Sequence, residues 1–161
     1  MNNMDIANGI IFKKMAISKE SFDDRIICQK KIYLLQSLGT DLGYSYNWYL
    51  RGPYSPALAN YVYSNAELLS STNFDDYKIS ESVTENIKRV NDLEKQRPTD
   101  LSLSSWYELL ASLIYIEKNR DSWKIKDDED ALFDALMKQK PQFDIEQCRN
   151  AFSVIKRESF I

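Results

Sequence analysis

The sequence predicts a single, mainly helical domain over residues 1–161. Three observations lead to this fold class. The length suits one hydrophobic core and is short for two. Apolar residues recur at helical spacing through most of the chain. Glycines and prolines are scarce, four of each, and nearly all of them fall between the periodic segments, which favours helices joined by short connections.

Seven helices are expected, and most of them begin after a residue that can cap a helix. A serine or aspartate side chain in this position accepts a hydrogen bond from a free backbone N–H of the first turn. The expected caps are Ser21, Ser55, Ser102 or Ser104, Asp127 and Asp144. Together with the apolar periodicity they predict helices over residues 5–15, 22–38, 56–69, 81–96, 103–118, 128–138 and 145–158.

The helix expected over residues 103–118 has the most apolar sequence. Its apolar residues leave little polar face and are Trp106, Leu109, Leu110, Leu113, Ile114 and Ile116. A helix that is apolar on nearly all sides is buried on nearly all sides. We therefore expect this helix in the middle of the fold.

Residues 44–50 form the best predicted β-strand. Large apolar side chains alternate there with other residues, as in a half-buried strand, and they are Tyr44, Tyr46, Trp48 and Leu50. The Gly52-Pro53 turn ends this strand. A second, short extended segment is expected to end near Ile79.

Histidine is absent from the sequence. This excludes Ser-His-Asp and Cys-His nucleophile activation, histidine general bases and zinc sites with histidine ligands. The two cysteines, Cys28 and Cys148, lie in expected helices and form no C-x-x-C pair, so we interpret them as small buried hydrophobes in a reducing cytoplasm. The sequence therefore predicts a protein that is not an enzyme and that binds no metal and no cofactor.

Charge and hydropathy narrow the range of partners. The net charge of −3 argues against a protein whose whole surface binds nucleic acid, although a local basic face stays open. Residues 1–14 lack the basic and apolar regions of a signal peptide, and no stretch approaches the roughly 18 apolar residues of a membrane span. We expect a cytoplasmic protein without membrane contact.

Residues 28–58 carry the most informative motifs of the chain. They begin with C-Q-K-K-I-Y-L-L-Q and continue after a short connection with L-G-Y-S-Y-N-W-Y-L-R-G-P-Y-S-P-A-L. This segment resembles the YwgA-like family of bacterial proteins and, more distantly, the Panacea-type antitoxin domain and the C-terminal domain of the DarG antitoxin. Those proteins share a helix of the form L-Q-K-L-x-Y-L-L-Q, an aromatic strand and a Y-G-P-Y-S-x-x-L turn.

Two later motifs extend the resemblance. Residues 106–115, W-Y-E-L-L-A-S-L-I-Y, and residues 138–145, K-Q-K-P-Q-F-D-I, are similar to a later helix of the family and to its lysine-proline hairpin. The chain also departs from the family pattern, because Arg51 stands where an aromatic residue is usual and Cys28 and Lys31 replace apolar residues.

The resemblance implies a mostly helical domain with a small two-stranded β element, related to winged-helix folds. It also implies binding rather than catalysis, because the characterised roles among these relatives are toxin neutralisation and adaptor-like contacts between proteins. Fold similarity alone does not fix function.

The G-P-Y-S turn has two interpretations that can hold together. In the first, Gly52, Pro53 and Ser55 form a structural turn, in which glycine permits an unusual backbone angle and serine caps the next helix. In the second, the turn holds a patch of side chains that bind a partner.

This expected partner-binding patch consists of Lys30, Lys31, Tyr49, Arg51 and Tyr54. Arginine and tyrosine often dominate the energetics of protein interfaces. Lys31 lies within the apolar arc of its helix, so a buried ammonium there would need a carboxylate partner. We expect instead that its stem is covered while its charge reaches the contact surface.

The leading hypothesis is a regulatory or antitoxin-like module that neutralises or recruits a partner protein, such as a toxin or effector encoded nearby. The alternative is a DNA-binding transcriptional regulator that uses a basic and aromatic face around Arg51, which the acidic net charge makes less favoured. The sequence also leaves open a homodimer, in which the tyrosine-rich surface would contact a second copy of this chain.

Overall fold

The computed structural model describes all residues from 1 to 161. The helices are α1 (Asn3–Lys14), α2 (Phe22–Ser37), α3 (Pro56–Ser71), α4 (Glu81–Asp92), α5 (Leu103–Lys118), α6 (Arg120–Trp123), α7 (Glu129–Gln139) and α8 (Ile145–Arg157), with a 3-10 turn, η1 (Leu93–Gln96), after α4. The two strands, β1 (Asn47–Tyr49) and β2 (Gly52–Tyr54), form one antiparallel sheet. The expected mainly helical fold with a small two-stranded element is confirmed, and a winged-helix-like arrangement is compatible with it.

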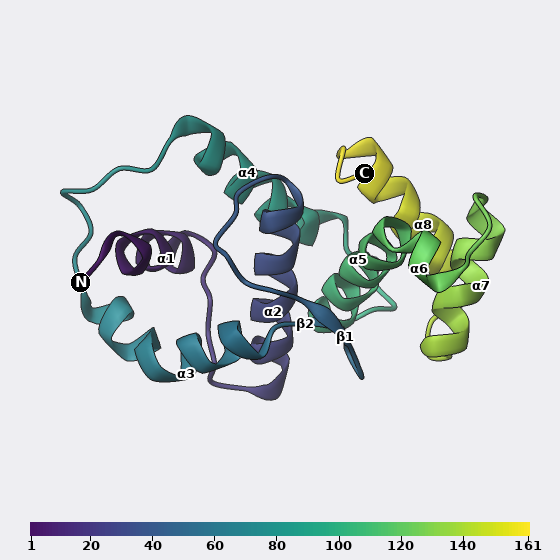
Figure 1. Ribbon diagram of the computed structural model, residues 1–161, viewed down its shortest axis with the longest axis horizontal. Helices are drawn as coiled ribbons and strands as arrows, with labels where there is room; N and C mark the ends of the chain where they lie inside the picture. Colours follow the sequence, from purple (N-terminus) through teal and green to yellow (C-terminus); the bar gives the residue numbers. More distant parts are fainter.

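Helices α2 and α5 pack against each other at the centre of the molecule (Figure 1). In that view α1 and α3 lie to one side of α2, and α7 and α8 lie beyond α5 on the other side. Helix α5 also contacts β2, α7 and α8, and most of its residues are buried, including Trp106 and Tyr107. The prediction that this helix occupies the middle of the fold is confirmed.

Local capping explains where most helices begin. The side chains of Ser21, Ser55, Ser102 and Asp144 accept hydrogen bonds from first-turn backbone N–H groups, as expected. The expected cap of α7 is displaced by one residue, because Asp128 and not Asp127 accepts the bond from Ala131 N. The sequence analysis missed a capping box at the start of α1 and the short helix α6.

The strand is shorter than expected. Only β1 (Asn47–Tyr49) is regular, and it pairs with β2 (Gly52–Tyr54), so the G-P-Y segment is itself the second strand. No strand forms near Ile79. Leu50 was expected to alternate inward, but it is 89% exposed, because the chain reverses direction at Leu50 and Arg51.

One hydrophobic core cluster contains 36 buried residues and draws on seven of the eight α-helices. Both cysteines are buried in it. No helix combines the length and apolar character that a membrane crossing requires. No group of three or more acidic, cysteine or histidine side chains is arranged to hold a metal ion.

Candidate functional site

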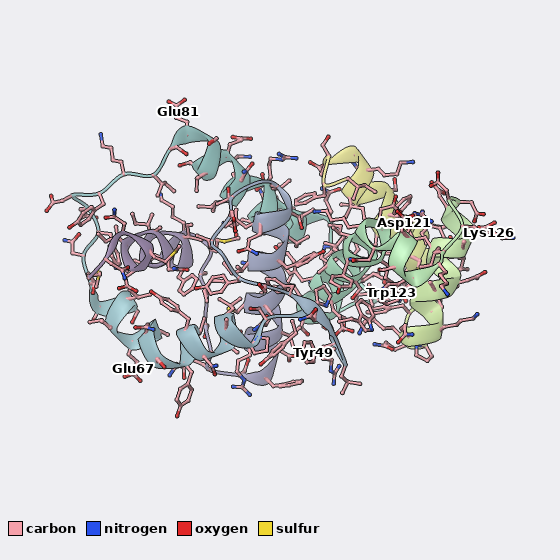
Figure 2. The ribbon with its side chains drawn as sticks, in the orientation of Figure 1. Tyr49, Glu67, Glu81, Asp121, Trp123 and Lys126 are labelled. Atoms are coloured by element: carbon pink, nitrogen blue, oxygen red, sulfur yellow. The ribbon has the colours of Figure 1, made fainter.

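The β1–β2 hairpin exposes three consecutive side chains at its turn. Tyr49 is 45% exposed, Leu50 is 89% exposed and Arg51 is also exposed. Figure 2 shows Tyr49 on the hairpin, at the edge of the molecule opposite Glu81, which begins α4. We call Tyr49, Leu50 and Arg51 the hairpin tip.

Two buried lysines donate hydrogen bonds to backbone carbonyls of the hairpin. Lys30 of α2 donates a hydrogen bond from Nζ to Pro53 O at 2.6 Å. Lys140, which follows α7, donates from Nζ to Leu50 O at 2.9 Å and forms an ion pair with Glu108 Oε2 at 3.0 Å. One carbonyl group in the turn and one in β2 therefore each accept a hydrogen bond from a lysine Nζ, and such a bond is strongest when the amine is protonated.

Gln29 fixes the end of the hairpin to α2. Its side-chain amide donates to Ser55 O at 3.0 Å and accepts from Ser55 N at 2.9 Å. Ser55 Oγ in turn accepts from Leu58 N at 3.2 Å and caps α3. The start of α3 and the end of β2 are thus tied to the same buried side chain.

Gly52 lies where the hairpin approaches α5 most closely. A Cβ atom on Gly52 would sit 2.4 Å from Ser112 Oγ, and the φ angle of Gly52 is +91°. Ser112 Oγ is buried and has no hydrogen-bond partner. A small side chain on α5 and a glycine on β2 together allow this contact.

Lys30 and Lys31 do not lie on an exposed partner-binding patch. Lys30 is 1% exposed and Lys31 is 7% exposed, because α2 is covered by α3, α4, α5 and β2. Lys31 Nζ donates to Met15 O at 2.9 Å, and Asn91 Oδ1 lies 3.5 Å away, so its charge reaches neither the surface nor a carboxylate within ion-pair distance. The expected patch is therefore reduced to Tyr49, Arg51 and Tyr54.

Burial changes the protonation of these lysines. Burial lowers the pKa of Lys30 to about 7; the nearby Glu108 opposes this shift, and the positive charges of Lys140 and Arg51 add to it. Burial also lowers the pKa of Lys140, against the attraction of Glu108. The pKa of Lys31 is lowered by burial as well.

A groove of about 650 Å³ lies beside the hairpin, between the start of α2 and the first half of α3. This volume falls within the usual range of ligand pockets, about 300–1,000 Å³. We call it the basic groove. Its lining residues include three of the expected patch, Arg51, Tyr54 and the buried Lys30, together with Lys19, Phe22, Arg25 and Tyr63.

Cations and aromatic rings alternate along the basic groove. The guanidinium groups of Arg51 and Arg25 lie 5.4 Å and 5.9 Å from the centre of the Phe22 ring. Lys19 Nζ lies 5.1 Å from the centre of the Tyr63 ring. These contacts hold the charged groups beside apolar surface, where their interactions are screened less than in open water.

Most of the tyrosine-rich segment is used inside the protein. The ring of Trp48 packs against Trp123 at 5.0 Å and Tyr115 at 5.6 Å, and Tyr46 donates a hydrogen bond to Gln29 O. Tyr44 donates to Asn8 Oδ1. These side chains fasten β1 and the preceding segment to the helices and are not free to stack with nucleobases.

The sequence analysis missed several residues of this site. Glu108 and Lys140 form a buried ion pair next to the hairpin. The available signal for it was Glu108, the single charged residue within the apolar stretch 106–116. Phe22 and Tyr63 carry no local signal, since they line the same groove only because α2 and α3 pack together.

In comparisons with known proteins, no family model, no curated sequence and no solved structure matches this chain.

Proposed function

We propose that this chain is a cytoplasmic, non-enzymatic protein-binding module of the YwgA-like type, antitoxin-like or regulatory, which neutralises or recruits a partner protein. A toxin or effector encoded nearby is the partner that this proposal favours. The observation that supports it most directly is the hairpin tip, whose exposed side chains stand on a backbone held by Lys30 and Lys140.

The way the hairpin is held favours a binding role. Burying charged groups costs free energy, and apolar side chains of similar size often stabilise a fold equally well or better. Here the buried ammonium groups bind hairpin carbonyls, so they restrict the conformation of the hairpin as well as filling space. A surface that is already ordered loses less conformational entropy when it binds a partner.

The hairpin tip also has suitable chemistry. Tyrosine and arginine are enriched among the residues that contribute most to binding free energy, and Leu50 adds apolar area next to them. The ring of Tyr49 is steadied by an edge contact with Tyr54, with ring centres 5.3 Å apart. The tip therefore offers both apolar area and directional hydrogen bonds.

The proposal is tested by capture of partners from the native host with a tagged chain. Leu50→Asp should abolish recovery of the specific partner without unfolding the protein, because Leu50 is 89% exposed. The matched control is Leu68→Asp, at an exposed leucine of α3, which should leave recovery unchanged. Recovery of the same proteins by the wild-type chain and Leu50→Asp would contradict the proposal.

The DNA-binding alternative is favoured by the cations of the basic groove. It is tested by titrating duplex DNA at rising salt, since binding through phosphates weakens steeply as ionic strength increases. The partly buried rings of Tyr44, Tyr46 and Trp48 disfavour it, because they are engaged in packing and hydrogen bonds.

A further inference from the structure

The basic groove concentrates positive charge in a chain whose net charge is −3. Three accessible cationic side chains line it, Lys19, Arg25 and Arg51, and Lys30 lies buried at its wall, against one acidic residue, Glu20. None of the four forms an ion pair, and the ion pairs of the protein lie elsewhere. The groove therefore has a positive charge that no carboxylate of the chain balances at contact distance.

The two arginines keep most of their hydrogen-bonding capacity. Arg25 donates one hydrogen bond, from Nη1 to Lys19 O at 3.0 Å. Arg51 is exposed and is held by its contact with the Phe22 ring. A guanidinium group has five N–H donors in a planar fork, and this geometry matches the two oxygens of a carboxylate.

Apolar surface is exposed between these charges. Phe22 is 54% exposed and Tyr63 is 79% exposed, and Ile26 and Val62 also line the groove. A ligand with polar groups alone would leave this apolar surface exposed to water. A ligand that carries both negative charge and an apolar group would cover it and gain the hydrophobic contribution.

We propose that the basic groove binds an acidic segment of the partner protein, with carboxylates on Arg25 and Arg51 and an apolar side chain against Phe22. This inference rests on the proposed function and specifies the chemistry of the segment that the partner presents. The hairpin tip and the basic groove share Arg51, so one partner can contact both surfaces.

The groove fits a peptide better than a nucleic acid. Seven of its fifteen lining residues are hydrophobic, which suits an apolar side chain more than a phosphate backbone.

The test is fluorescence anisotropy of labelled probes with the full chain. The first probe is the peptide Asp-Glu-Asp-Phe-Asp-Glu-Asp. Two matched peptides separate the contributions, one with serine in place of phenylalanine and one with asparagine and glutamine in place of the carboxylates. A single-stranded oligonucleotide of equal charge is the fourth probe.

The groove is tested with the double variant Arg25→Glu and Arg51→Glu, both at exposed positions. The control is the double variant Lys78→Glu and Lys126→Glu, which changes the net charge equally at exposed sites outside the groove. Thermal melting of both variants checks that the fold is retained. We expect the groove variant to weaken binding of the first peptide by at least about tenfold and the control to leave it nearly unchanged.

The peptide with serine in place of phenylalanine and the peptide without carboxylates should each bind more weakly than the first peptide. The oligonucleotide should also bind more weakly than the first peptide. Equal losses in both double variants, no binding of the acidic peptide, or tighter binding of the oligonucleotide would overturn the inference. Partner capture that depends on Leu50 would still support the proposed function in that case. Binding of the acidic peptide without capture of any partner would contradict the proposed function. It would still support the inference that the groove binds acidic segments.

Discussion

At Gly52 the hairpin backbone comes so close to α5 that no side chain fits between them. Two independent constraints meet at this residue, a φ angle of +91° and the position of Ser112 Oγ 2.4 Å from a Cβ atom. A left-handed backbone angle is costly for residues other than glycine. The steric contact adds to that cost because Ser112 belongs to the packed central helix.

Gly52→Ala should therefore destabilise the protein more than Gly43→Ala. Gly43 also has a positive φ angle, +82°, but a Cβ atom there meets nothing within 4 Å. We expect a difference of about 1–3 kcal/mol in the free energy of unfolding, the usual cost of overpacking. Denaturant unfolding of the two variants measures it, and equal losses would show that only the backbone angle matters.

Lys31 shows how a lysine can be buried without a carboxylate partner. Its ammonium group donates to the carbonyl of Met15, just after α1, and lies near the side chain of Asn91 in α4. It also lies 5.7 Å from the centre of the Tyr107 ring. The charge is thus compensated by dipoles, a ring face and the more distant carboxylate of Glu94, none of which the sequence pattern reveals.

At the scale of elements, the hairpin is positioned by helices that lie on both sides of it. Lys30 reaches it from α2, and Lys140 reaches it from the end of α7. A two-stranded hairpin alone is marginally stable in water. Its order in this protein therefore depends on contacts made by other elements.

Lys30→Met should loosen the hairpin selectively. The substitution removes the donor to Pro53 O, although it also removes a costly buried charge, so global stability should change little or increase. We expect faster hydrogen exchange at residues 49–54, which native-state exchange measured by mass spectrometry detects.

Lys31→Met is the matched control for that experiment. The neighbouring ammonium group is also buried, but it donates to Met15 O and not to the hairpin. Its loss should leave exchange at residues 49–54 unchanged. Similar acceleration in both variants would mean that the hairpin responds to packing of α2 and not to the Lys30 hydrogen bond.

At the scale of the whole molecule, buried ionisable groups link stability to pH. The folded-state pKa of Lys30 is about 7, below its ordinary value of 10.5, so between these values the unfolded chain binds a proton that the folded protein does not. Stability therefore rises with pH through this window. Lys31 and Lys140, with lowered pKa values, contribute in the same direction.

Above the ordinary tyrosine pKa of 10.0 the dependence should reverse. Burial raises the pKa of Tyr33, Tyr44 and Tyr107, so the unfolded chain loses protons there that the folded protein retains. Stability should therefore be highest near pH 10, where the two effects meet, and urea unfolding at a series of pH values measures this maximum. In Lys30→Met the rise above neutral pH should be smaller, and an unchanged profile would contradict the assignment to Lys30.

The sequence by itself determined the helical class, most helix starts and the central position of α5. These features depend on interactions within a few residues, such as the Ser21 and Asp144 caps, or on apolar periodicity along one helix. It also pointed to the hairpin that carries Arg51 and Tyr54, because glycine permits a positive φ angle, proline fixes its own φ angle and serine caps the next helix.

Only the tertiary structure decided which side chains face solvent at the candidate site. Lys30 and Lys31 are buried because α2 is covered by neighbouring elements, and Leu50 is exposed because β1 pairs with the segment directly after it. The basic groove likewise forms only where α2, α3 and the hairpin meet. Burial and pairing depend on contacts between residues far apart in the chain, so periodicity within one segment could not specify them.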